Sequence, residues 1–279
     1  NMNKIKKWEL RKCLLNKFAV ALMIILFIGK IISAIVYNAN LPEGVDTDIY
    51  KEYMKTLEGK YTKEKSEYIE NEMARISSLE DSQFSYVVKY DKGLISKEEF
   101  DNIMYEIRIA PKILSTLSYI SSKCDYYENS YREGIFFYDL DIQRYMSVMG
   151  LDFIGLTFVI YICMSLYFSD ISAKTTVLVT TSYYGKKYTN RIRLILGLII
   201  CVLSTVILSI TEFVAKYITM DIDYFKMPVK AMLDMNNFAF DTNIGSGLLI
   251  IYGGRVLLTV VIVLGFSIAA RIKTNLQRK

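Results

Sequence analysis

The sequence predicts an all-α polytopic membrane protein with about four transmembrane helices and a mainly helical extracellular domain. Three observations support this fold class. Hydrophobic residues make up 52% of the 279 residues, they are collected in four long blocks, and the charge of the intervening segments alternates in sign. A soluble chain of this length would be expected to form one or two domains without such blocks.

Each apolar block is close to the length that crosses a bilayer. A helix rises about 1.5 Å per residue, so about 20 mainly apolar residues span the hydrocarbon layer. The blocks occupy residues 18–37, 153–168, 194–210 and 244–270. A basic start precedes the first block, as in a signal peptide, but this block is longer than a typical signal core, and we expect it to remain as a span.

The charges predict the orientation. Residues 1–17, 169–193 and 271–279 together hold 15 basic and 2 acidic residues, whereas residues 38–148 and 218–244 together hold 16 basic and 25 acidic residues. Lys and Arg collect on the cytoplasmic flanks of membrane helices, so both chain ends are predicted to be cytoplasmic. The formal net charge of +5 then needs no nucleic-acid partner, because the bases lie where the topology places them.

Three regions follow from this topology in a multi-pass protein of the cell membrane. Residues 1–37 form a basic cytoplasmic N-terminus and the first transmembrane helix. Residues 38–148 form an extracellular helical domain, which is long enough to fold by itself. Residues 149–279 contain transmembrane helices two to four, with a cytoplasmic element at 169–193.

The extracellular domain is predicted to be mainly helical because its apolar residues recur at helical spacing. Ser96 and Glu99 fit a capping box at the start of one helix. Pro111 is expected to separate that helix from the next. Alternation over residues 84–88 predicts a short strand. Cys124 is the single cysteine of this domain, so an intrachain disulfide within the domain is excluded.

The sequence lacks the residues that several enzyme classes require. It contains no histidine, which removes His-based triads and the usual catalytic zinc sets. It has no P-loop, since Gly59 and Lys60 are followed by Tyr61 and not by Ser or Thr. We therefore expect no enzymatic activity and no cofactor in this chain.

Three ionisable residues interrupt or end the apolar blocks. Lys30 either reaches the nearer interface or contributes to a pathway. Glu212 lies four residues before Lys216, in the favourable order for a helical ion pair. This pair either lies at the membrane interface or takes part in substrate passage. Arg255 follows two glycines, so the fourth span can begin at Val256 after a short entering segment.

Residues 168–187, FSDISAKTTVLVTTSYYGKK, separate the second and third blocks. The cytoplasmic segment that contains them is too long for a tight turn and too short for a domain. It has an apolar centre and closes with Gly185, Lys186 and Lys187, which predict a turn followed by charge. A short amphipathic helix that lies along the membrane and contacts a cytoplasmic partner would have this pattern.

This stretch resembles the cytoplasmic element after the second span of the bacterial ABC-2 type permeases, the membrane subunits of ATP-driven exporters. YKEYMKTLEGKYTKEKSEYIENE and GLISKEEFDNIMYE resemble the helical extracellular domain of a Gram-positive branch, inserted between the first two spans. GIFFYDLDIQRYM resembles the segment that leads into the second span. The likeness covers nearly the whole chain, and it lies in the order and topology of these stretches.

The resemblance implies a permease that pairs with a second permease half, identical or not, and with separate ABC ATPase subunits that bind ATP and Mg. Residues 168–187 would then belong to the coupling element that enters the ATPase cleft. By position, the contact would be made by Asp170, Lys174, Thr175, Gly185, Lys186 and Lys187. Family members usually have six spans, so a further pair is expected after Lys279, in a chain truncated from a six-span permease.

Other functions are weighed against this one. The first is a membrane-anchored receptor or scaffold, whose extracellular domain binds a ligand or partner without transport. It explains residues 38–148 but gives no reason for residues 168–187. A membrane-bound protease would need intramembrane Glu and His clusters that the sequence lacks. The sequence does not choose among peptides, antibiotics and other amphiphiles as the exported substrate.

Overall fold

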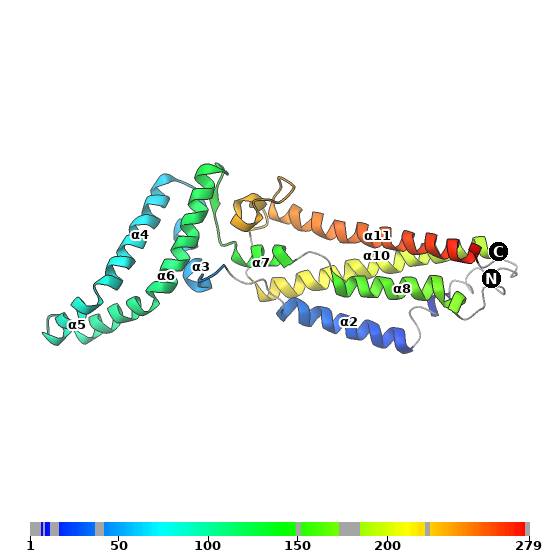
Figure 1. The fold of residues 1–279 in the computed structure, drawn as a ribbon, viewed down its shortest axis with the longest axis horizontal. Coiled ribbons are helices and arrows are strands. Elements are labelled where there is room, and N and C mark those ends of the chain that lie inside the picture. The colour runs from blue at the N-terminus through cyan, green and yellow to red at the C-terminus, as the bar shows by residue number, and fades with distance from the viewer. Residues whose placement is uncertain are drawn as a thin grey trace. The chain divides into compact units, whose positions relative to one another are not determined.

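The computed structural model describes residues 7, 9–11, 17–36, 42–148, 152–172, 185–220 and 224–276. These residues are helical almost throughout, so the all-α prediction is confirmed (Figure 1). The chain divides into two compact units. Unit 1 comprises Asn1–Asn38, Val148–Asp221 and Leu248–Lys279, and unit 2 comprises Ala39–Ser147 and Ile222–Gly247.

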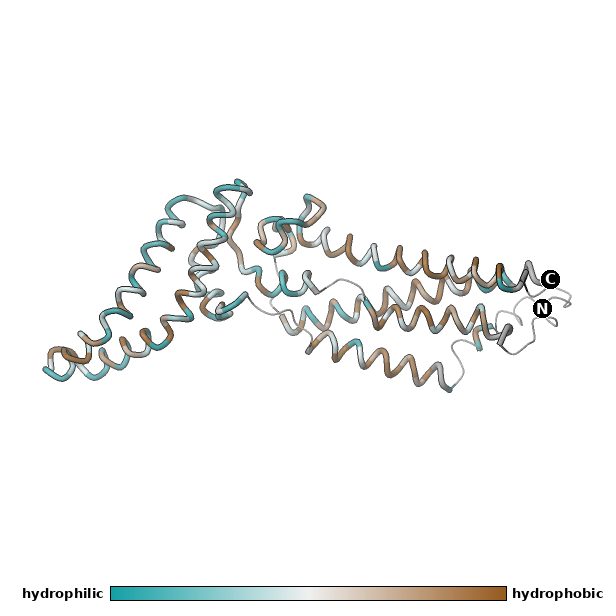
Figure 2. The backbone as a smooth tube through the Cα atoms, viewed as in Figure 1, coloured by the Kyte–Doolittle hydropathy of each residue, from teal (hydrophilic) through white to brown (hydrophobic). Residues whose placement is uncertain are grey.

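Unit 1 is built from long apolar helices. They are α2 (Lys17–Val36), α8 (Phe153–Ser172), α10 (Gly185–Thr219) and α11 (Ile244–Leu276). Figure 2 shows hydrophobic residues along each of them. Within α10 and α11, Tyr188–Thr219 and Ile244–Lys273 are long and apolar enough to cross a membrane, whereas the apolar stretches of α2 and α8 are shorter, Val20–Ile35 and Phe153–Phe168.

Apolar side chains lie both inside and outside this bundle. Ile162 of α8, Cys201 of α10 and Val263 of α11 are fully buried in a shared core. On the outward faces, Leu203 of α10 is 56% exposed and Leu257 of α11 is 68% exposed. Outward faces of this composition suit an apolar surrounding, because large exposed apolar patches are rare in water.

Two sequence expectations fail in unit 1. The fourth helix does not begin at Val256, because α11 continues through Gly253 and Gly254. Each glycine costs about 1 kcal/mol relative to Ala, but an unbroken helix keeps every backbone group hydrogen-bonded where water is absent. Gly185 is not in a turn that precedes a helix, because α10 begins at this residue.

Unit 2 is a mainly helical domain. Its elements are α3 (Thr47–Leu57), β1 (Gly59–Lys60), α4 (Lys63–Asp81), α5 (Gln83–Asp91), α6 (Lys97–Asn129), β2 (Ile135–Phe136), α7 (Leu140–Val148), and the 3-10 turns η1 (Val229–Ala231) and η2 (Leu233–Met235). β1 and β2 pair antiparallel, with Gly59 opposite Phe136. The core gathers fully buried side chains of α3, α4 and α6, among them Met54, Ile76 and Leu117.

The capping box is confirmed, whereas two other local predictions for unit 2 are wrong. Ser96 accepts from the backbone N–H of Glu99, whose carboxylate accepts from the backbone N–H of Ser96. Pro111 does not end this helix, because α6 passes through it, and Figure 1 shows α6 bending along its length. Burial of Ala110 and Ile113 on either side offsets the hydrogen bond that Pro111 cannot donate.

The predicted strand at residues 84–88 is the helix α5. The alternating residues do not share a buried face, because Phe84 is 79% exposed. The helix is held instead by Tyr90, whose ring stacks on Phe100 of α6 at a centroid distance of 4.4 Å. Tertiary packing therefore overrides the local alternation.

Unit 2 also includes a segment that the sequence analysis did not assign to the domain. Residues 224–247 pack on the end of α6, where the hydroxyl of Tyr127 donates to the carbonyl of Ala231 at 2.7 Å. The hydroxyl of Tyr126 donates to the carbonyl of Lys230 at 2.9 Å. The domain is thus formed from two segments of the chain.

Candidate functional site

Four charged side chains meet inside unit 1, and we call them the charge network. Lys30 lies in α2, Asp152 directly precedes α8, Glu212 lies in α10 and Arg255 lies in α11. Their side chains are only 7 to 10% exposed. Three helices of the bundle and the residue that precedes the fourth therefore each contribute one charge to a single buried cluster.

The carboxylate of Glu212 is the centre of the charge network. Arg255 Nη1 donates to Glu212 Oε2 at 2.8 Å, and Arg255 Nη2 donates to Glu212 Oε1 at 3.3 Å. Lys30 Nζ also contacts Glu212 Oε2, and it lies 3.0 Å from Asp152 Oδ1. The two cations and two carboxylates thus form one continuous chain of ion pairs whose formal charges cancel.

Asp152 has a local structural reason for its position. Its Oδ1 accepts the backbone N–H of Gly155 at 3.0 Å, which is the hydrogen bond of an N-cap at the start of α8. A carboxylate is also favoured there by the helix dipole. Gly155 leaves room for the second oxygen, because a Cβ at this position would lie 2.7 Å from Asp152 Oδ2.

A second buried ion pair lies elsewhere on the same bundle. Arg193 of α10 donates from Nε and Nη2 to Glu9 Oε1 at 2.9 and 2.7 Å. Arg193 and Glu212 stand 19 positions apart in α10, which is about 28 Å along a helix. This distance is close to the hydrocarbon thickness of a bilayer, about 30 Å.

The helix between these two charged levels contains no charged residue, but it is not purely apolar. The hydroxyls of Thr205 in α10 and Thr259 in α11 lie 3.0 Å apart. Each also lies within hydrogen-bond distance of a carbonyl of its own helix, Cys201 for Thr205 and Arg255 for Thr259, so one hydroxyl can donate to the other while the second donates to its own helix. Paired hydroxyls of this kind link neighbouring helices in apolar surroundings.

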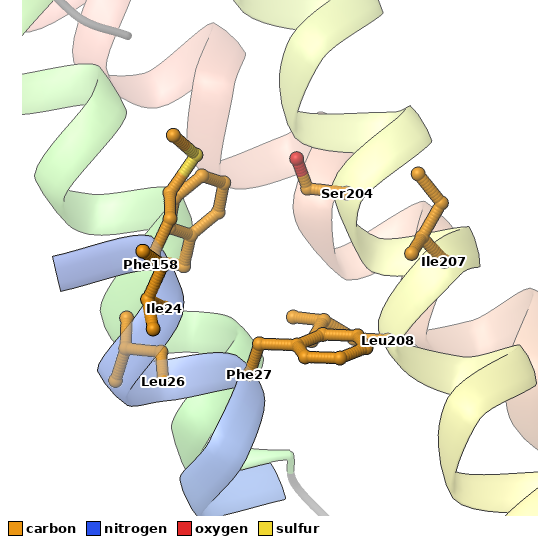
Figure 3. Close-up of a pocket in the computed structure, with 8 residues that line it drawn as sticks. Ile24, Leu26, Phe27, Phe158, Ser204, Ile207 and Leu208 are labelled. Atoms are coloured by element: carbon orange, nitrogen blue, oxygen red, sulfur yellow. The ribbon is translucent and has the colours of Figure 1, made fainter. Parts of the chain in front are cut away.

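Three of the same helices also form an apolar groove. It has a volume of about 340 Å³ and is lined by side chains of α2, α8 and α10. Phe27, Phe158 and Leu208 form much of its wall, and Ser204 contributes its hydroxyl-bearing side chain (Figure 3). The groove is not an enclosed cavity, so it is accessible from outside the bundle.

The structure brings together all three residues that the sequence marked as intramembrane polar groups. Lys30 is buried at 6% exposure and paired with Asp152 and Glu212. Glu212 binds Lys30 and Arg255, whereas the sequence predicted Lys216 as its partner. Sequence reasoning missed Asp152, although an acidic residue directly before an apolar block is an N-cap signal.

The predicted coupling residues are only partly described. Asp170 lies in the last turn of α8, and Gly185, Lys186 and Lys187 form the first turn of α10. Lys174 and Thr175 lie outside the described residues, as do the side chains of the other four. The C-terminal end of α8 and the N-terminal end of α10 lie near Arg193. Glu212 lies near the opposite end of α10.

The site offers electrostatic and binding chemistry. In the part of the chain that the structure describes, no group of three or more His, Cys, Asp or Glu side chains is arranged to hold a metal ion. Comparison of the chain with protein-family models, curated proteins and solved structures gives no match. The function is therefore argued from the charge network, the groove and the two charged levels of α10.

Proposed function

We propose that this chain is the membrane-spanning permease subunit of an ATP-driven exporter. The charge network carries this proposal, because ionisable groups buried among apolar helices are costly and are typical of transport pathways. Ion pairing between all four helices offsets that cost only while the helices keep this arrangement. The helices of such a bundle can move relative to one another when the charged side chains exchange their ion-pair partners.

The membrane placement rests on the spacing of charges along α10. Arg193 and Glu212 would lie near the two boundaries of the hydrocarbon layer, with the uncharged part of the helix between them. The outward leucines and isoleucines of the bundle would then face lipid chains. In this placement α2 and α8 also cross the membrane, which gives four spans with both chain ends on the cytoplasmic side.

The ATPase would act at the end of the bundle opposite to the charge network. The coupling element, residues 169–193, joins α8 to α10, and each of these helices leads to one carboxylate, Asp152 or Glu212. Closure of the ATPase on the element would tilt both helices and change the partners of Lys30 and Arg255. Such a change is a two-state transition driven by binding energy at a distant site.

The proposal includes partners outside this chain. Two ATPase subunits would bind ATP and Mg, and a second permease half, identical or not, would complete the pathway. Unit 2 would be extracellular under this topology. The resemblance to ABC-2 type permeases favours these partners, and the absence of a P-loop in the sequence requires that ATP be bound elsewhere.

The experiment is co-purification of the full chain with a candidate ABC ATPase that is expressed with it. We expect Lys186→Glu with Lys187→Glu to abolish ATPase retention while the permease stays folded. The matched control reverses Lys92 and Lys97, which are exposed in unit 2, and should retain the ATPase. Equal retention by both double variants would reject the coupling assignment.

A receptor or scaffold remains the second candidate, because unit 2 has a polar cleft of about 490 Å³. Tyr126 and Tyr131 stack with their rings 7° from parallel on one side. Lys230 and Asp241 also line this cleft and contribute opposite charges. A ligand that binds this cleft with no effect on the ATPase would favour the receptor.

A further inference from the structure

Two groove residues stand about one helical turn from the charge network, each on a different helix. Phe27 precedes Lys30 by three residues in α2, and Leu208 precedes Glu212 by four residues in α10. Residues three or four apart share one face of a helix. The groove and the network therefore lie next to each other along both helices.

The groove residue of the third helix lies farther from the network, because Phe158 follows Asp152 by six residues, about 9 Å along α8. Phe158 of α8 follows Gly155 by three residues, and Gly155 is the residue against which Asp152 Oδ2 rests. Phe158 follows its network residue, whereas Phe27 and Leu208 precede theirs in α2 and α10. This order is expected, because α8 starts near the network and α2 and α10 end near it. Figure 3 shows Phe27 and Leu208 pointing toward one another, with Phe158 on the neighbouring helix.

One atom at this junction has an unmet hydrogen-bonding capacity. Asp152 Oδ2 is buried and has no hydrogen-bond partner among the described residues, while Oδ1 accepts the backbone N–H of Gly155 and lies 3.0 Å from Lys30 Nζ. The Asp152 side chain is only 8% exposed. A buried carboxylate oxygen with free lone pairs is costly, so it favours a ligand that donates a hydrogen bond.

We propose that the groove binds a single-chain amphiphile that carries a primary-amine head group. The hydrocarbon chain would lie among Phe27, Phe158 and Leu208, and the ammonium would donate to Asp152 Oδ2. A volume of about 340 Å³ lies at the low end of the range for ligand pockets, about 300 to 1,000 Å³, which suits one chain better than the two chains of a phospholipid.

This inference rests on the membrane placement in the proposed function and names a substrate class for the exporter. It does not depend on the ATPase contact. The test therefore uses the full chain alone in phosphatidylcholine nanodiscs, so that loss of ATPase retention and loss of amphiphile binding are separate results.

The probe is radiolabelled dodecylamine, measured in excess of its binding to empty nanodiscs. Dodecyltrimethylammonium carries the same charge without an N–H donor, and dodecanoate carries the opposite charge. We expect dodecylamine to bind about tenfold more tightly than dodecyltrimethylammonium, as a hydrogen bond to a charged group allows, and dodecanoate to bind most weakly. Equal binding of the amine and the quaternary ammonium would overturn the head-group assignment.

Two pairs of variants locate the site. Asp152→Ser keeps an N-cap for α8 but removes the free carboxylate oxygen, so the amine preference should disappear, whereas Asp48→Ser at an exposed position should leave it unchanged. Ser204→Phe fills the groove and should abolish binding of the amine. Its control, Leu203→Phe, adds bulk at the adjacent outward-facing position and should not.

A membrane lipid with an amine head is the competing occupant. If phosphatidylethanolamine in the nanodiscs displaces dodecylamine, the groove is a lipid site and the single-chain assignment is wrong. If binding persists at that lipid composition and is lost only in the two site variants, the assignment stands. Retained binding by both site variants would place the amine elsewhere and overturn the proposal.

Discussion

Glu212 of α10 and Arg255 of α11 form a buried ion pair through two hydrogen bonds, at 2.8 and 3.3 Å. The pair joins two helices that each contain a stretch long enough to cross a membrane. Lys30 extends it to α2 and, through Asp152, to the start of α8. Removing one member of such a chain leaves an uncompensated buried charge, so the network couples the four helices energetically.

The buried ion pair of unit 2 gives a prediction about stability. Lys123 Nζ lies 2.6 Å from Asp139 Oδ2, and both side chains are fully buried. Lys123→Met should therefore destabilise unit 2 by about 3 to 5 kcal/mol, because Asp139 would stay buried without its cation. The double variant Lys123→Met with Asp139→Leu should recover much of that loss.

The thiol of Cys124 can report this unfolding. Cys124 is 2% exposed in the core of unit 2, and burial raises the pKa of its thiol to about 11. In a chain whose other three cysteines are changed to Ala, thiol labelling against urea should show an earlier midpoint for Lys123→Met. A midpoint equal to that of the parent chain would contradict the assigned role of the pair.

Gly134 gives a prediction about packing. Its Cα lies so close to the ring of Tyr127 that a Cβ would overlap the ring carbons, and Tyr127 is held by its own hydrogen bond to Ala231. Gly134→Ala should destabilise unit 2 by about 1 to 3 kcal/mol. Thermal unfolding of the full chain measures this. Gly29→Ala in α2, where nothing lies within 4 Å of the new methyl, should not lower the midpoint.

Glu72 gives a prediction about pH. Arg75 donates to both carboxylate oxygens of Glu72 at 3.0 Å, and these bonds lower the pKa of the carboxyl below its usual value of 4.5. The folded pKa is below the unfolded one, so the stabilisation is present above about pH 4.5 and is lost as pH falls through the folded pKa.

Unfolding midpoints at about pH 7 and about pH 3 test this assignment. The parent chain should lose more stability between the two values than Glu72→Gln, which has no proton to bind at this position. Glu70→Gln, at an exposed position of the same helix, should behave like the parent. Equal losses in the parent and in Glu72→Gln would show that this carboxyl does not carry the pH dependence.

Much of the fold could be predicted from sequence because its signals are local. Apolar length predicted the helices of unit 1, and the spacing of Ser96 and Glu99 predicted the start of α6. The failures involve contacts between distant segments. Pro111 stays within α6 because neighbouring residues are buried, and residues 84–88 are helical because α5 packs on α6.

The candidate site shows the same division. The sequence marked Lys30, Glu212 and Arg255 as ionisable groups in apolar surroundings, which is a local observation. Their mutual pairing depends on how four helices pack, and it cannot be obtained from spacing along one helix. Asp152 was missed because it precedes its helix, although it completes the network as both N-cap and ion-pair partner.

The measurement that tests the central claim most directly is ATP hydrolysis by the assembled complex in proteoliposomes, with Glu212→Gln compared with the parent chain. Glu98→Gln, an exposed change in unit 2, serves as the control. We predict that Glu212→Gln still retains the ATPase but lowers its hydrolysis rate about tenfold, which corresponds to about 1.4 kcal/mol, while the control is unchanged. Hydrolysis at the parental rate in an assembled Glu212→Gln complex would contradict the claim that the charge network is part of the ATP-driven cycle.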